Sequence, residues 1–134
     1  MAGYLLDTNH LGAALTIGSG ILRRFDQARR SGIRLGTCVP VLCELEAGIQ
    51  QTRDLDRRRR VLKLLFRYFR IWPIDPPLAE AYGAIFIDLV RRGRSLSHVD
   101  IVLAALARQM DLTLLTTDRD FEALPDVKAE NWLT

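Results

Sequence analysis

The stretch Tyr4-Leu5-Leu6-Asp7-Thr8-Asn9-His10 decides how the rest of the chain is arranged. Three apolar residues end abruptly at a polar group, which is typical of a short buried strand whose end projects from a sheet. In open α/β folds ligands bind beyond the carboxyl ends of parallel strands, so this pattern places Asp7 at a ligand-binding position. Asn9 is expected to cap a helix that begins near His10. Taken alone, the same residues also fit a turn and a helix cap without any chemistry.

Strands and helices are expected to alternate along the rest of the chain. Apolar runs with polar ends predict the strands, and amphipathic periods predict the helices between them. The further strands are expected at 34–39, 70–74, 112–116 and, at a sheet edge, 127–132. The helices are expected at 11–17, 21–30, 41–50, 54–69, 78–92 and 97–110, with a helical turn at 121–124. This order predicts an α/β fold: a doubly wound parallel β-sheet with right-handed crossovers and helices on both faces.

Composition limits the class of protein. The chain of 134 residues is 49% apolar and 26% charged, which is ordinary for a globular domain, and no linker or repeat divides it, so we expect one domain over residues 1–134. No apolar run is long enough to cross a membrane and the N-terminus lacks the order of a signal peptide, so we expect a cytoplasmic protein with no membrane partner. Cys38 and Cys43 form no metal or redox motif and are expected to be buried small hydrophobes.

Arginine dominates the positive charge. The net charge is +3, and only Lys63 and Lys128 among the 19 basic residues are lysines. Arginine suits bidentate contact with phosphates, although a GC-rich genome produces the same bias. The run Arg57–Arg60 is interpreted as a solvated helix face rather than a nucleic-acid contact. Basic helices around an acidic centre would suit a metal-dependent enzyme that acts on a polyanion.

Four acidic positions are expected at one end of the sheet. Asp7 follows the first strand, Asp118 follows the fourth, and Asp100 lies in the first turn of an otherwise apolar helix. On the helix after the second strand, Glu44 and Glu46 lie on opposite edges of the apolar face, and periodicity leans only weakly to Glu44. These positions converge if the sheet is parallel.

Crowded carboxylates repel one another and need a neutralising partner. Mg²⁺ and Mn²⁺ prefer oxygen ligands and are held by a few carboxylates, and Asp120 is a fifth candidate ligand. One or two such ions can activate water and stabilise the leaving oxygen in phosphodiester cleavage. Asp100 also fits a capping box with Ser97, and the two roles are compatible.

The motifs together resemble a PIN-domain ribonuclease and, more narrowly, a VapC-type toxin of a bacterial toxin–antitoxin pair. The resemblance covers essentially the whole chain, and His98 just before Asp100 is a mild departure from it. The motifs occur in the expected order: Asp7-Thr8-Asn9, then Glu44-Leu45-Glu46-Ala47-Gly48-Ile49, then residues 100–107, then residues 115–121.

The resemblance implies a single PIN-like domain that acts as a magnesium- or manganese-dependent endoribonuclease, cuts RNA and arrests translation. It also implies a VapB-type antitoxin as inhibitor, a homodimer, and a toxin–antitoxin hetero-oligomer. It favours Glu44 over Glu46. By position it implies metal binding by Asp7, Glu44, Asp100 and Asp118, with Asp120 as a less constant neighbour, and polar support from Thr8, Asn9 and Thr116.

Other readings of the acidic positions are weaker. A non-catalytic PIN-like module that binds RNA or a partner remains an alternative, although such a module has little reason to crowd carboxylates. A receiver-type phosphoacceptor domain needs a lysine after a late strand, and neither lysine is placed there. A zinc hydrolase needs closely spaced histidines, whereas His10 and His98 are interpreted as helix-cap or surface residues.

Overall fold

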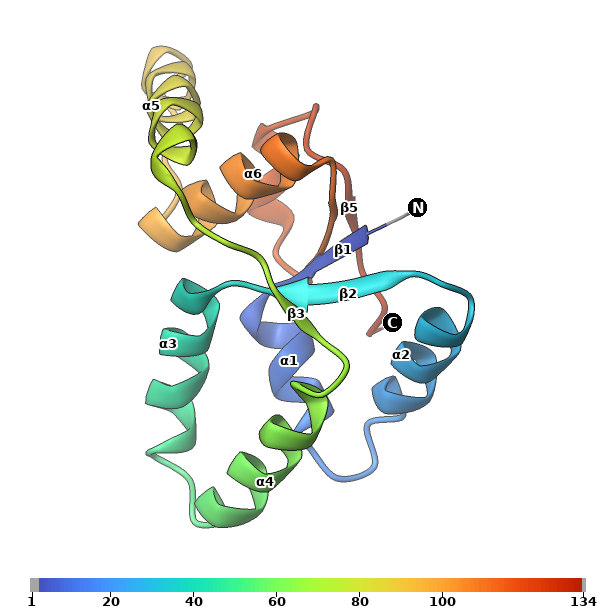
Figure 1. Ribbon diagram of the computed structural model, residues 1–134. Coiled ribbons are helices and arrows are strands. Elements are labelled where there is room, and N and C mark those ends of the chain that lie inside the picture. Colours follow the sequence, from blue (N-terminus) through green and yellow to red (C-terminus); the bar gives the residue numbers. More distant parts are fainter. Residues whose placement is uncertain (1–2, 134) are drawn as a thin grey trace.

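The computed structural model describes residues 3–133, and a five-stranded parallel sheet lies at its centre (Figure 1). The strand order is β3-β2-β1-β4-β5, and each neighbouring pair is parallel. This confirms the predicted parallel sheet. The strands are β1 (Gly3–Leu6), β2 (Arg34–Thr37), β3 (Arg70–Ile71), β4 (Thr113–Leu115) and β5 (Ala129–Glu130).

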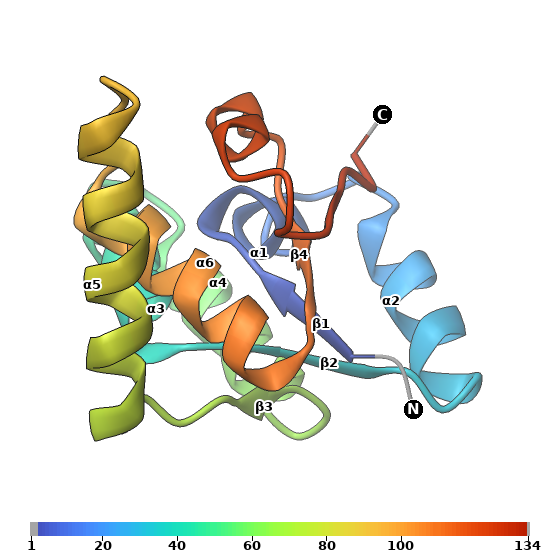
Figure 2. The same cartoon turned by 90° about the horizontal axis from the view of Figure 1, so that it is seen from above.

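Helices cover both faces of the sheet. Figure 1 shows α1 to α4 on one side and α5 with α6 on the other, and Figure 2 shows α5 lying alongside α6. A 3₁₀ helix (Arg119–Ala123) follows β4. The α-helices are α1 (Thr8–Ala14), α2 (Ile21–Arg30), α3 (Val39–Ile49), α4 (Leu55–Leu65), α5 (Pro76–Arg91) and α6 (His98–Met110). Within residues 3–133, every helix is too short or too polar to cross a bilayer.

Fully buried leucines mark β1 and β4, two of the three inner strands of the sheet. The side chains of Leu5 and Leu6 in β1 and of Leu114 and Leu115 in β4 are fully buried. Residues 103–106 of α6 are also fully buried, as predicted for a helix that is apolar nearly all round. Because β1 and β4 are parallel neighbours, their carboxyl ends lie together at one edge of the sheet.

The first helix begins earlier than predicted, and its cap is Asp7 rather than Asn9. The Asp7 carboxylate accepts a hydrogen bond from the backbone N–H of Thr8 at 2.7 Å, and α1 runs from Thr8 to Ala14 instead of over 11–17. Aspartate caps helices as well as asparagine does. The Asn9 side chain is instead drawn toward the end of β4, where it contacts Thr116.

The edge strands are shorter than predicted. β3 and β5 have two residues each, against the five and six expected, because an edge strand pairs on one side only and the sequence pattern does not reveal where pairing stops. The helix expected over 54–69 ends at Leu65, and Phe69 is buried in the turn that follows. The helix over 21–30 is confirmed with its predicted bounds.

The prediction that both cysteines are buried is wrong for Cys43. Cys38 is fully buried before α3, and burial raises the pKa of its thiol to about 11. Cys43 is exposed because the buried face of α3 is formed by Val41, Leu45 and Ile49, and Cys43 lies off that face. Pro40 occupies the first turn of α3, where its missing N–H would have no helical partner.

Candidate active site

Asp7 lies at the carboxyl end of β1 and is 6% exposed. Its backbone N–H donates to the carbonyl of Leu115 at 2.9 Å, which fastens the end of β1 to the end of β4. One carboxylate oxygen accepts from the N–H of Thr8 at 2.7 Å, and the other accepts from the Thr116 hydroxyl at 2.8 Å. The orientation of this carboxylate is therefore fixed by the first turn of α1 and by the residue that follows β4.

Thr116 connects Asp7 to Asp118. Its hydroxyl donates to the Asp7 carboxylate and accepts from the backbone N–H of Asp118 at 3.0 Å. The Asp118 carboxylate in turn accepts from the N–H of Asp120 at 2.8 Å and caps the 3₁₀ helix. Asp118 thus combines a capping role with a position beside Asp7. Asp120 is exposed, and its contact with Asp118 is made by its backbone rather than by its carboxylate.

Glu44 and Glu46 face different surroundings on α3. The Glu44 carboxylate accepts from the Thr8 hydroxyl at 2.7 Å and so lies toward Asp7. The Glu46 carboxylate pairs with Arg59 on α4 and accepts from the Gln50 side chain at 3.2 Å. The hydrogen bond from Arg59 is the main cause that lowers the pKa of Glu46. The structure therefore places Glu44 beside the other site carboxylates and Glu46 in an ion pair.

Asp100 occupies the first turn of α6, where its backbone N–H donates to the Ser97 hydroxyl at 3.2 Å, as the predicted cap requires. Burial raises the pKa of the Asp100 carboxyl to about 6. The hydrogen bond from Ser97 opposes this rise, whereas the negative charges of Asp7, Asp118 and Glu44 add to it. The negative charges of all three other candidate ligands therefore act on the Asp100 carboxyl.

Asp7 experiences the same crowding. Burial raises the pKa of its carboxyl, the hydrogen bonds from Thr116 and Thr8 oppose the rise, and the charges of Glu44 and Asp118 add to it. The structure thus brings four predicted carboxylates, from α1's cap, α3, α6 and the end of β4, around one space. Their ionised forms repel one another there.

The donor set fits a hard divalent cation. Within residues 3–133, no three Asp, Glu, His or Cys side chains are arranged to hold a metal ion directly. Mg²⁺ and Mn²⁺ keep several waters and need only a few carboxylate oxygens, so a looser ring of carboxylates suits them. Burial and neighbouring carboxylates together raise the pKa of Asp7 and of Asp100, and this favours a cation at the site, because a positive charge would offset both burial and repulsion.

Comparison with known proteins places the chain in a family. The sequence profile described as "PIN domain" matches residues 4–127. The chain is also 32% identical to Ribonuclease VapC4 of Mycobacterium tuberculosis over 78% of this chain and 82% of that protein. The chain belongs to the PIN-domain family, in its VapC branch. This confirms the family indicated by the sequence motifs.

Two further relatives cover nearly the whole chain. Ribonuclease VapC2 of Haemophilus influenzae is 29% identical over 99% of this chain and 100% of that protein. The DNA-bound VapBC structure from Salmonella typhimurium is similar with a TM-score of 0.83 and 25% identity, and covers 98% of this chain and 99% of that chain. The resemblance to VapC proteins therefore extends over both sequence and fold.

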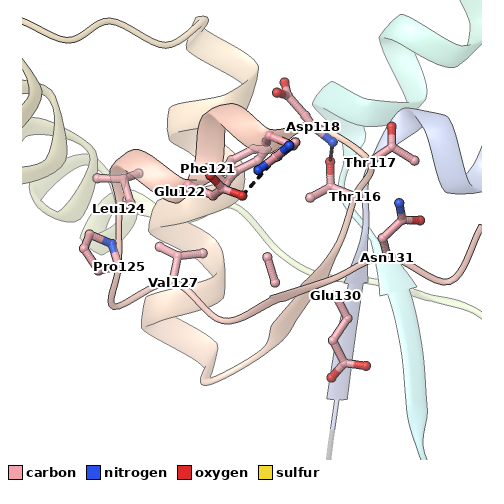
Figure 3. Close-up of a pocket in the computed structure, with 12 residues that line it drawn as sticks. Thr116, Thr117, Asp118, Phe121, Glu122, Leu124, Pro125, Val127, Glu130 and Asn131 are labelled. Carbon is pink, nitrogen blue, oxygen red and sulfur yellow. Dashed lines mark hydrogen bonds and ion pairs between the residues drawn. The ribbon is translucent and has the colours of Figure 1, made fainter. Parts of the chain in front are cut away.

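A pocket of about 430 Å³ in this PIN domain is lined in part by Asp118, one of the four candidate ligands (Figure 3). Thr116, Thr117 and Asp118 line one end of it, and Leu124 and Pro125 lie at the other. No local sequence pattern indicates this pocket, because it is formed by a 3₁₀ helix and by irregular segments around β5. Its walls combine polar and apolar groups beside Asp118.

His10 is the main polar residue that the sequence interpretation misplaced. It is fully buried rather than a cap or surface residue, and burial, followed by the charge of Arg24, lowers its pKa to about 4. Its ring contacts the Asn9 side chain at 2.8 Å and the backbone N–H of Trp132 at 3.0 Å. Trp132 lies 122 residues further along, so no local pattern could have indicated this burial.

The other predicted surface residues have mixed outcomes. His98 is exposed, and its ring stacks on Tyr82 with the ring centroids 5.9 Å apart. The run Arg57–Arg60 is not a simple solvated face. Arg57 and Arg58 both pair with Asp54, the cap of α4, and Arg59 pairs with Glu46, whereas Arg60 is exposed. Carboxylates at the start of α4 and on α3 lie within reach of these arginines.

Proposed function

We propose that this VapC-family chain is a metal-dependent endoribonuclease that cleaves RNA phosphodiester bonds, acts as the toxin of a type II toxin–antitoxin pair and arrests translation. The observation that carries the proposal is the group of four carboxylates whose charges act on one another, with Asp7 buried among them. A protein without chemistry gains nothing from this arrangement, since the crowding costs free energy in the absence of a cation. The names of the VapC relatives support the same activity.

In this proposal Asp7, Glu44, Asp100 and Asp118 hold Mg²⁺ or Mn²⁺, with Asp120 at the edge of the site. The bound cation supplies activation of the attacking water and neutralisation of charge on the phosphate. The polar neighbours orient the ligands: Thr8 holds Glu44, and Thr116 holds Asp7 while it accepts from the N–H of Asp118. Fixed ligands reduce the reorganisation needed when the phosphate arrives.

The substrate strand needs room beside these ligands. The pocket next to Asp118 offers space for part of an RNA chain, and its mixed walls suit a nucleotide with both polar edges and apolar faces. Exposed arginines and Lys63 around the molecule would contact phosphates and contribute affinity without selecting a sequence. RNAs that take part in translation are cytoplasmic, so we propose that the protein acts in the cytoplasm.

The proposed partner is a VapB-type antitoxin that neutralises the nuclease. The Salmonella typhimurium relative was solved as VapBC bound to DNA, which supports a toxin–antitoxin hetero-oligomer for this chain as well. We also propose a homodimer of the toxin within that assembly.

Cleavage of total cellular RNA by purified, partner-free protein tests this function. The protein is assayed with Mg²⁺ or Mn²⁺, with EDTA, and as Asp7→Asn and Asp100→Asn variants. Glu46→Gln is the matched control, because Glu46 lies on the same helix as Glu44 but is engaged by Arg59. We expect discrete fragments from the wild type and from the control, and none with EDTA or with either folded aspartate variant.

Three results would contradict the proposal or the role of a residue in it. Binding of RNA without cleavage in any metal would favour the non-catalytic module. Cleavage that persists in both aspartate variants would mean that these carboxylates are not the site. An Asp7→Asn variant that unfolds would show that Asp7 is structural, because removal of one crowded charge should leave the metal-free fold intact.

A further inference from the structure

The protonation of His10 follows from its hydrogen bonds. Its Nε2 accepts from the backbone N–H of Trp132 at 3.0 Å, and a backbone amide can only donate. Nε2 therefore carries no proton, and in the neutral ring the proton lies on Nδ1. The ring is neutral because it is fully buried, and the pKa lowered to about 4 agrees with this.

The position of this proton fixes the orientation of the Asn9 amide. Nδ1–H donates to Asn9 Oδ1 at 2.8 Å, and the backbone N–H of Thr117 donates to the same oxygen at 3.3 Å. With Oδ1 held by two donors, the amide nitrogen must point the other way. It contacts the Thr116 hydroxyl oxygen at 3.4 Å and the Asp7 carboxylate at 3.5 Å.

We infer that His10 is a positioning residue of the nuclease site: it holds the Asn9 amide with its N–H groups toward Asp7 and Thr116. This inference rests on the proposed nuclease function. In the opposite orientation the amide oxygen would face the crowded carboxylates and add to their repulsion. With the observed orientation, an N–H group of Asn9 faces the Asp7 carboxylate at 3.5 Å.

The chain of contacts continues away from the site. Trp132, which supplies the N–H that selects the tautomer, packs between Tyr4 and Arg24: its ring centroid lies 5.0 Å from that of Tyr4, and the Arg24 guanidinium carbon lies 4.4 Å from it. Aromatic and cation–π contacts of this kind hold the C-terminal segment in place. The C-terminal segment is thus linked to Asp7 by a series of hydrogen bonds that runs through His10 and Asn9.

Two substitutions separate the two hydrogen bonds of His10. The amide nitrogen of an asparagine side chain falls close to the place of Nδ1, and the amide of glutamine falls close to that of Nε2. His10→Asn therefore keeps the donor toward Asn9 and loses the acceptor for Trp132, whereas His10→Gln does the reverse. Both remove a buried ring, so both should lower thermal stability by similar amounts.

Steady-state cleavage of a short RNA by each folded variant tests the inference. We expect His10→Gln to lower kcat about tenfold or more with little change in KM, as is common when a supporting hydrogen bond is lost. His10→Asn should keep kcat close to the wild-type value. Equal losses in both variants would reduce His10 to a structural residue, and unchanged kcat in both would remove any role for it.

A spectroscopic measurement gives a readout that does not depend on cleavage. In a ¹⁵N-histidine NMR spectrum of the intact protein at neutral pH, His10 should show the ¹⁵N shifts of a neutral ring with its proton on Nδ1. A proton on Nε2 would overturn the inference. A wild-type protein that shows the Nδ1–H form but cleaves no RNA in any metal would instead contradict the proposed function.

Discussion

The Thr8 hydroxyl donates to the Glu44 carboxylate at 2.7 Å and joins the first turn of α1 to α3. Glu44 is exposed, so this bond is the contact that orients a side chain which would otherwise sample several rotamers. The same turn supplies the N–H that fixes Asp7. One threonine thus holds two candidate ligands, one through its backbone and one through its hydroxyl.

Thr8→Val should separate these two roles. The valine keeps the shape and the backbone N–H but loses the hydroxyl, so we expect kcat of RNA cleavage to fall about tenfold while Asp7 stays in place. Thr8→Ser should recover most of the activity. Thermal unfolding should change little in either variant, because the site of substitution is half-buried. Valine activity equal to that of the wild type would mean that Glu44 needs no such support.

Asp100 should make the metal-free protein less stable as the pH rises. Its pKa is raised from 3.8 to about 6 in the folded state, so the unfolded state loses the proton more readily. The contribution of protonated Asp100 to the free energy of unfolding is complete below about pH 4 and is lost as the pH rises through 6. A shift of this size corresponds nominally to ~3 kcal/mol, which we reduce to ~1 kcal/mol because solvent screens a half-exposed group.

Denaturant unfolding of wild type and Asp100→Asn at pH 4 and pH 7 in EDTA checks this. We expect the variant to be more stable than the wild type by ~1 kcal/mol at pH 7 and to match it near pH 4. A variant that is less stable at pH 7 would mean that the Asp100 carboxylate is mainly a cap for α6. Asp88→Asn, on the exposed surface of α5, serves as a comparison without this dependence on burial.

Gly36 should tolerate no side chain. A Cβ there would lie 2.6 Å from the backbone oxygen of Arg70 and 2.6 Å from the indole nitrogen of Trp72. Gly36→Ala must therefore push β3 and Trp72 away from β2, and we expect a loss of ~1–3 kcal/mol in the free energy of unfolding. Gly83→Ala is the matched control in α5, where a Cβ meets nothing within 4 Å and should add up to ~1 kcal/mol. Equal effects of the two substitutions would contradict the tight approach at Gly36.

The central part of the fold was predictable because its physical cause is local. A strand buried on both faces must be an apolar run, so β1 and β4 are visible in the sequence, and a nearly all-apolar α6 must be buried. The edge strands were predicted too long because their length depends on pairing with a neighbour rather than on their own residues. For the same reason, the end of α4 at Leu65 could not be read from the helical period.

The site was predictable to the extent that it depends on strand ends. Asp7 and Asp118 follow apolar runs, and the parallel sheet brings them together. Choosing between Glu44 and Glu46 needed the contact of each with another helix, since both lie on edges of the same apolar face. His10 was missed because its burial is caused by Trp132 at the far end of the chain, and the two are not linked by any local pattern.

Added Mg²⁺ or Mn²⁺ should stabilise the protein more at pH 7.5 than at pH 5.5. Protons compete with the cation for Asp100, whose pKa of about 6 lies between these values, and the raised pKa of Asp7 acts in the same direction. Ligand binding to the folded state raises the midpoint of thermal unfolding by an amount that grows with the logarithm of its affinity. We therefore expect a clear upward shift at pH 7.5, a smaller one at pH 5.5, and almost none at either pH for Asp7→Asn. The Glu46→Gln variant should behave like the wild type, because its carboxylate pairs with Arg59 rather than facing the site. A shift of equal size at both pH values, or one that persists in Asp7→Asn, would mean that the cation binds elsewhere on the molecule.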